Sequence, residues 1–178
     1  MQISPRSLGV LVGVVLICLA GCSHQRNSDS NAALESKVPT LEKQINDIKP
    51  GLGEIMGTIE QHHAKLYYAG TKANWPLAAY ELTEIQEGLG DAMQFYPGQF
   101  KQVRVPLPQL IPSMTNGSIA QLRQAIEQKN ERAFVQAYQS LSNSSTSCHA
   151  AANDPFIKIQ APAPGLFSDQ DFAPETSK

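Results

Sequence analysis

NERAFVQAYQSLSNSSTSCHA, residues 130–150, carries the clearest secondary-structure signal in the chain. Five of its residues recur at intervals of four and three: Phe134, Tyr138, Leu141, Ser145 and Cys148. This is the spacing of one face of an α-helix. Asn130 is a residue type that often caps the start of a helix. The pattern therefore predicts a helix that turns Ser145 and Cys148 toward a core.

Three further segments show helical spacing. The first is residues 52–69, which Gly70 would end, and the second runs from an Asn74 cap to the Pro-Gly pair at 97–98. The third begins near residue 116, after a connection of uncertain structure, and a short amphipathic turn at 41–48 precedes them all. No convincing strand hairpin occurs. We therefore expect an all-α, four-helix-bundle-like domain.

The C-terminal part of the chain does not fit a helix. Its prolines, at positions 155, 162, 164 and 174, exclude a continuous helix. Its apolar side chains are nevertheless too many for a free tail. We expect an extended Pro-rich C-terminal segment that crosses the bundle, with the helical bundle domain at residues 39–172 and a disordered tail at 173–178.

The N-terminus has the features of a secretory signal peptide, residues 1–21. One positive charge precedes the apolar run LGVLVGVVLICLA, residues 8–20, which is too short to span a bilayer comfortably. Its end, Leu19-Ala20-Gly21-Cys22, resembles the lipobox of bacterial lipoproteins. An ordinary signal peptide with a chance cysteine is the alternative.

The lipobox resemblance implies an acylated Cys22 that holds the protein to membrane lipid. Ser23, the next residue, implies the outer membrane of a Gram-negative cell, with the domain facing the periplasm. The polar stretch at 22–38 then reads as the acylated N-terminus and a flexible tether. A periplasmic protein of unknown identity is the partner we expect. Acidic side chains outnumber basic ones, 16 to 14, which excludes nucleic acid as a partner.

Cys148 and His149 form the second half of a haem-attachment motif. In C-x-x-C-H, two thiols add to the haem vinyl groups and the histidine that follows binds the iron. Ser145 stands where the first thiol would be. The pair is therefore a worn haem site, a working half of one, or a coincidence.

Two long stretches resemble a family of small exported bacterial proteins of cytochrome c type. They are GEIMGTIEQHHAKLYYAGTKANWPLAAYELTEIQEGL, residues 53–89, and LRQAIEQKNERAFVQAYQSLSNSSTSCHAAANDPFIKIQAP, residues 122–162. Members read A-Y-x-x-L-T-x-x-C-N-x-C-H and then F-I-x-I-x-x-P. The matching residues are Ala137, Tyr138, Leu141, Cys148, His149, Phe156, Ile157, Ile159 and Pro162. The resemblance implies haem c, and Ser145 is the departure that puts covalent haem in question.

Two functions follow from these observations. The first is a cofactor-free binding or structural module built on a degenerate cytochrome c-like domain. The alternative is a single-thioether haem c protein in electron transfer or haem sensing, held by Cys148 with His149 as proximal ligand. Some other use of the Cys148 thiol also stays open. We expect no enzyme, because the sequence contains no nucleophile elbow, P-loop, dinucleotide fingerprint or H-E-x-x-H motif.

The segment at 52–69 offers two candidates for a distal haem ligand, His63 and Met56. The alternative is a surface His62 beside a His63 at the edge of the core, bonded to a carbonyl or carboxylate. Two adjacent histidines diverge, so we do not expect them to bind a metal alone.

Aromatic, acidic and glycine residues in and near the predicted second helix each suggest a packing role or an exposed position. The aromatic residues at the first interhelix turn should pack together: Tyr67, Tyr68, Trp75 and Tyr80. The carboxylates of Glu81, Glu84 and Glu87 should form a solvated edge. Glycines 88 and 90 should allow another helix to approach closely.

Overall fold

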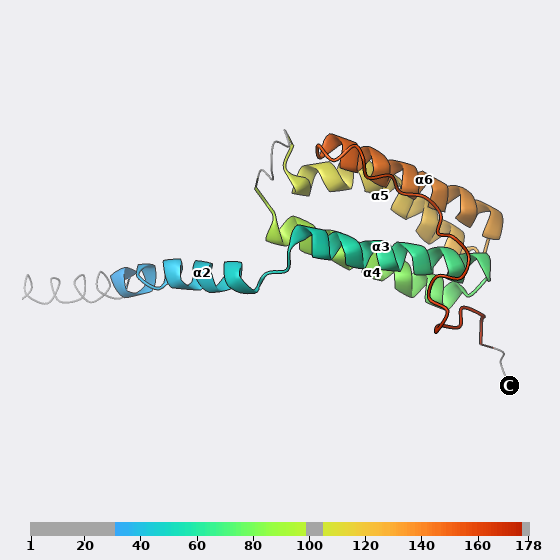
Figure 1. Cartoon of the computed structure of the whole chain (residues 1–178), viewed down its shortest axis with the longest axis horizontal. Coiled ribbons are helices and arrows are strands. Elements are labelled where there is room, and N and C mark those ends of the chain that lie inside the picture. Colours follow the sequence, from blue (N-terminus) through green and yellow to red (C-terminus); the bar gives the residue numbers. More distant parts are fainter. Residues whose placement is uncertain (1–30, 99–104, 176–178) are drawn as a thin grey trace, which may run out of the picture. The chain divides into compact units, whose positions relative to one another are not determined.

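The computed structural model describes residues 31–98 and 105–175, and within these ranges it is all-helical, without strands (Figure 1). The chain divides between Lys49 and Pro50 into two units. The first contains α2 (Val38–Ile48), which follows a helical turn at residues 31–35. The second contains α3 (Leu52–Thr71), α4 (Trp75–Phe95), α5 (Leu107–Glu127) and α6 (Glu131–Ala151). The predicted all-α class is confirmed.

The four helices of the second unit form an antiparallel bundle (Figure 1). Each helix packs against the next one in the chain, and α6 also contacts α3, which closes the bundle. The chain reverses sharply after α3 and α5, where Ala73 and Lys129 adopt positive φ angles of 55° and 51°. The compact unit begins at Pro50. The predicted domain start at residue 39 lies within α2, which belongs to the first unit.

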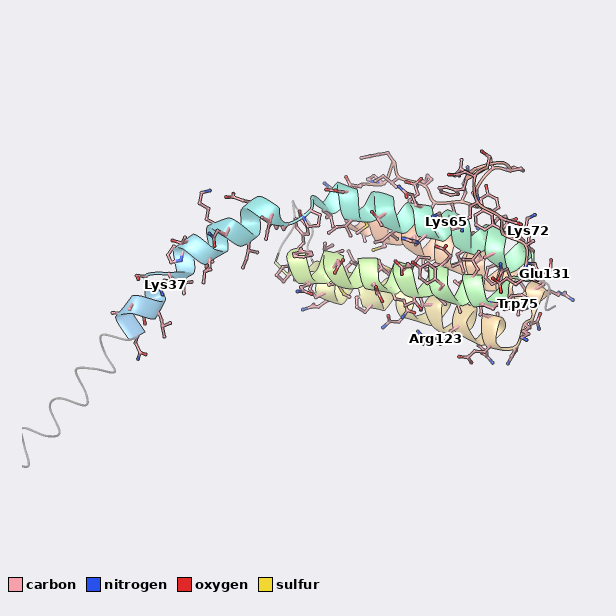
Figure 2. The ribbon with its side chains drawn as sticks, turned by 90° about the horizontal axis from the view of Figure 1, so that it is seen from below. Lys37, Lys65, Lys72, Trp75, Arg123 and Glu131 are labelled. Atoms are coloured by element: carbon pink, nitrogen blue, oxygen red, sulfur yellow. The ribbon has the colours of Figure 1, made fainter. Side chains whose placement is uncertain are left out.

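Two asparagines begin helices as predicted. The Asn74 side chain accepts a hydrogen bond from the Leu77 amide at 3.3 Å, and that of Asn130 accepts one from the Ala133 amide at 3.0 Å. Each supplies an acceptor for an amide that has no partner within its helix. Trp75 and Glu131, the first residues of α4 and α6, lie at the same end of the bundle (Figure 2).

Helix α5 starts at Leu107, nine residues before the predicted start near 116. Pro108 is in its first turn, where the missing amide proton costs little. Pro112 lies inside the helix and removes one backbone hydrogen bond. Burial of Leu107, Leu110 and Ile111 offsets that loss, since these side chains are at most 4% exposed.

Glycines let two side chains enter between helices. A Cβ on Gly70 would lie 2.1 Å from the Phe134 ring, and one on Gly88 would lie 2.6 Å from Ile59. Gly70 is thus a packing residue inside α3 and not its end. The close approach expected at Gly88 is found, whereas a Cβ on Gly90 would meet nothing within 4 Å.

After α6, residues 153–175 form neither helix nor strand and run back along the bundle (Figure 1). Thr146 of α6 accepts a hydrogen bond from the Ile159 amide at 2.9 Å. The Tyr68 hydroxyl of α3 donates to the Ala163 carbonyl. Phe172 is buried with its ring centroid 5.1 Å from that of Tyr68. Apolar burial therefore holds this segment down.

The predicted signal peptide and Cys22 lie outside the described residues. No helix within the described ranges is long and apolar enough to cross a membrane. The helical turn at 31–35 shows that the predicted tether at 22–38 has local structure in its second half.

Candidate functional site

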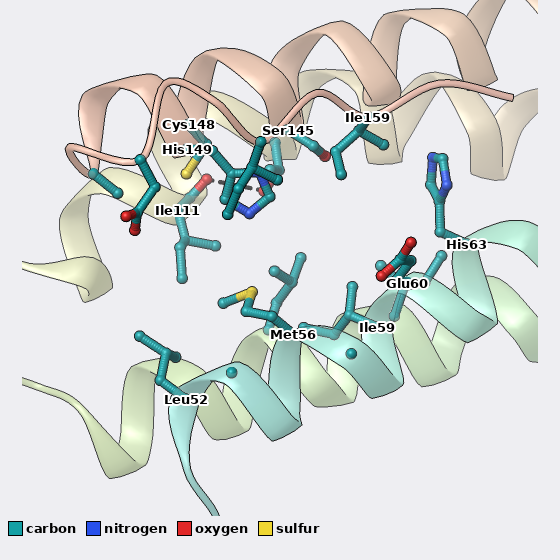
Figure 3. Close-up of a pocket in the computed structure, with 18 of the residues that line it drawn as sticks. Leu52, Met56, Ile59, Glu60, His63, Ile111, Ser145, Cys148, His149 and Ile159 are labelled. Atoms are coloured by element: carbon teal, nitrogen blue, oxygen red, sulfur yellow. Dashed lines mark hydrogen bonds between the residues drawn. The ribbon is translucent and has the colours of Figure 1, made fainter.

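A half-open cavity of about 500 Å³ lies in the bundle unit, between α3 and α6 (Figure 3). Helices α4 and α5 contribute its apolar floor through Ile85, Leu89 and Ile111. The segment after α6 adds Phe156, Ile157 and Ile159. A space of this size with mainly apolar walls is that of a ligand pocket.

Helix α6 presents the three residues of the partial C-x-x-C-H pattern to this cavity (Figure 3). Ser145 and Cys148 both line it, as the four-three spacing of the helix predicts, and His149 lines it as well. Burial raises the pKa of the Cys148 thiol. The thiol therefore stays protonated at neutral pH and is a poor nucleophile on its own.

His149 has an unsatisfied ring nitrogen. Among the residues that the structure describes, its Nδ1 is the buried side-chain polar atom without a hydrogen-bond partner. Burial lowers the pKa of His149, and Asp154 and Glu60 partly oppose this effect. A neutral imidazole with an unpaired nitrogen is suited to bind a metal, since it needs to lose neither a proton nor a hydrogen bond.

Helix α3 supplies the opposite wall. Met56 lies across the cavity from His149 and Cys148, with Leu52 and Ile59 on either side of it along the helix (Figure 3). The thioether of methionine is a known axial ligand of haem iron. The structure thus brings together one predicted distal candidate and the predicted proximal residue, which are far apart in the sequence.

His63, the other distal candidate, also lines the cavity but is engaged elsewhere. Its Nδ1 is 2.8 Å from the Tyr138 hydroxyl and its Nε2 is 3.2 Å from the Ser142 hydroxyl. The Tyr138 hydroxyl also reaches the His63 carbonyl, and the Ser142 hydroxyl also reaches the Tyr138 carbonyl. Burial lowers the pKa of His63 to about 4. Both ring nitrogens of His63 therefore have a hydrogen-bond partner within the bundle in either neutral tautomer.

The two adjacent histidines differ from the alternative of a surface His62 beside a His63 bonded to a carbonyl or carboxylate. His63 is buried and bonded to hydroxyl groups, whereas His62 contacts carboxylates. His62 Nδ1 is 2.7 Å from Glu81, and its Nε2 is 3.7 Å from Glu84. Glu81 is only 2% exposed. The prediction of a solvated acidic edge is therefore wrong at Glu81, since α3 covers it.

Sequence reasoning missed this contact because His62 and Glu81 lie on different helices. The prediction that Tyr80 packs with the other aromatic residues of the first interhelix turn is wrong, since its side chain is 53% exposed. Trp75 does pack, with its ring centroid 6.1 Å from that of Phe134. In the described ranges, no group of three or more His, Cys, Asp or Glu side chains is placed to hold a metal ion by itself. A metal at this site would need a further ligand set, such as the four nitrogens of a porphyrin.

The chain was compared with models of known protein families, with curated proteins and with solved structures, and none of them matches it.

The site residues fit a haem group on the chemistry of their donors. His149 offers a buried nitrogen without a partner, Cys148 a thiol next to it, and Met56 a thioether on the opposite wall. The rest of the lining is mainly aliphatic, as a porphyrin face requires. Ser145 lines the cavity where a second thiol would stand, so Cys148 is the one thiol among the lining residues.

Proposed function

We propose that the bundle binds haem in this cavity through a single thioether to Cys148, with His149 as the axial ligand, and serves electron transfer or haem sensing. One observation carries the proposal. Cys148, His149 and Met56 line one half-open, mainly apolar cavity between α3 and α6. The support is that one thiol, one imidazole and one thioether from two facing helices meet at a mainly apolar space large enough for a ligand.

The residues that line the cavity would have different roles in such a site. Burial keeps the His149 imidazole neutral and available at neutral pH, and Asp154 and Glu60 nearby favour positive charge at this position. The aliphatic walls would cover the apolar faces of a bound porphyrin. Haem would supply a redox-active iron. Met56 is the distal residue of this proposal, because the nitrogens of His63 are held by Tyr138 and Ser142.

Absorbance of the full chain, produced together with a cytochrome c maturation system, tests the proposal. We expect a Soret band that survives extraction with acidified acetone in the wild type. Cys148→Ala should still bind haem, but acidified acetone should then extract the haem and remove the Soret band. Ser147→Ala is the matched control, since Ser147 is exposed on the same helix and should leave the spectrum unchanged. A folded, colourless wild type would instead favour the cofactor-free binding or structural module.

We also propose that the protein is anchored to the outer membrane, facing the periplasm, through acyl chains on Cys22. The support is the lipobox-like sequence that ends at this residue. Fractionation of cells that express Cys22→Ser tests the anchor, because the variant should accumulate as unprocessed or soluble protein. Membrane association at the wild-type level would exclude acylation of Cys22 as the anchor.

A further inference from the structure

The helical segment before the bundle carries an apolar stripe that its own unit leaves open. The stripe consists of Leu34, Val38, Leu41, Ile45 and Ile48, whose exposed fractions range from 48% to 81%. Their intervals are four, three, four and three residues. This is a heptad pattern, in which apolar residues recur every 3.5 residues on average, and it is the signature of a coiled-coil seam.

The identity of the seam residues favours a coiled coil of two parallel helices. Val38 and Ile45 take the positions called a in the heptad, while Leu34, Leu41 and Ile48 take the positions called d. β-Branched residues at a with mainly Leu at d favour parallel dimers over trimers and tetramers. The seam is therefore matched to a second copy of itself.

Charged residues beside the seam also complement a second copy. Lys37 occupies a g position and Glu42 the e position five residues later, so in a parallel, in-register dimer each Lys37 meets Glu42 of the other copy. The ion pair between Lys43 and Asp47, at 2.6 Å, lies on the outer face at positions f and c. Pro39 takes position b, which is also outside the seam. Residues 36–37 form a turn between the helical residues 31–35 and α2, so the continuous helical part of the seam is Val38, Leu41, Ile45 and Ile48.

A membrane surface is a poorer match for this face. Residues 31–49 contain three lysines and three acidic residues, and no aromatic side chain. Helices that lie in a membrane interface are typically rich in basic residues on the polar face and carry Trp or Phe on the other. The balanced charge of this segment favours a protein partner.

We propose that residues 34–48 pair with the same residues of a second copy as a short, parallel, two-stranded coiled coil, which makes the protein a dimer. The proposal does not depend on haem. The seam is shorter than the three or four heptads of a robust coiled coil, so the dimer should exchange with monomer. Covalent trapping is therefore the suitable measurement.

The test uses the full chain with Cys148→Ser, which removes the thiol of the cavity. Leu41→Cys in this background places a thiol in the seam, and mild oxidation should link most of the chains as dimers. Lys43→Cys, on the outer face of the same helix, is the matched control and should link several-fold less. Adding Ile45→Asp to the Leu41→Cys variant should abolish the linkage.

Charge reversal tests the register. In the Leu41→Cys background, Lys37→Glu or Glu42→Lys alone should reduce the disulfide-linked fraction several-fold, and the two together should restore it. Equal linkage from positions 41 and 43, or no rescue by the double reversal, would overturn the proposal. So would protection of the thiol at position 41 by anionic lipid vesicles without any dimer, because that result would assign the stripe to a membrane surface.

Discussion

The hydroxyl oxygen of Tyr138 lies 2.8 Å from Nδ1 of His63, and the two rings stack with their centroids 4.4 Å apart. This contact joins α6 to α3 in the middle of the bundle, and Ser142 completes it from the next turn of α6. Burial raises the pKa of Tyr138 and lowers that of His63, so both groups stay neutral. A neutral, fully bonded polar network fixes how two helices face each other.

Removal of the Tyr138 hydroxyl should destabilise the bundle. Tyr138→Phe keeps the ring but leaves a buried nitrogen of His63 without its partner, which costs about 1–3 kcal/mol of unfolding free energy. Tyr80→Phe is the control, since Tyr80 is exposed and should change stability by less than about 0.5 kcal/mol. Chemical denaturation measures both. Equal effects of the two variants would contradict a structural role for the buried contact.

Stability should fall as the pH drops, because His63 is buried in its neutral form. Its folded pKa of about 4 is below the ordinary value of 6.5, so between these values the unfolded chain binds a proton that the folded chain does not. The contribution is complete above pH 6.5 and is lost as the pH falls toward 4. Between pH 7 and 5 the wild type should lose about 2 kcal/mol more than His63→Gln. Identical pH dependence in the two proteins would show that His63 is not the titrating group.

A methyl group at Gly70 should be costly although alanine favours helices. The added Cβ would lie 2.1 Å from the fully buried Phe134 ring, and overpacking of this kind costs about 1–3 kcal/mol. Gly90→Ala in α4 is the matched control. A Cβ there meets nothing within 4 Å, so this variant should gain up to about 1 kcal/mol. Thermal unfolding of both variants decides whether α3 and α6 approach each other as closely as the structure shows.

Ser145→Cys should improve haem attachment. Ser145 and Cys148 line the same cavity, so the variant restores two thiols beside His149. With a maturation system we expect more covalent haem than in the wild type, and a reduced spectrum with both vinyl groups saturated. Ser147→Cys, at an exposed position, should gain none. If the Ser145 variant folds but stays colourless, the cavity does not accept haem and Cys148-His149 is a relic.

Local sequence patterns predicted most of the helices. The four-three spacing of α6 and the Asn caps of α4 and α6 were sufficient, because they report on backbone geometry within one or two turns. The start of α5 was not predictable in this way. Its prolines read as a connection, and only the burial of Leu107, Leu110 and Ile111 against other helices explains why a helix forms there.

The sequence predicted only the residues that α6 contributes to the candidate site. The pattern of α6 placed Ser145 and Cys148 on one face and His149 next to them. It left Met56 and His63 as equal alternatives on a different helix. The structure separates these two, because Tyr138 and Ser142 bond to both nitrogens of His63.

The sequence by itself determined the helices and the side of α6 that faces the core, because hydrogen bonds within a helix and the 3.6-residue period are local. Tertiary structure alone decided which residues meet across helices. It buried Glu81 against His62, seated Phe134 on Gly70 and left a cavity in front of Cys148. Such contacts depend on how helices pair and rotate against one another, and that is a property of the whole bundle's packing, which no single helix encodes.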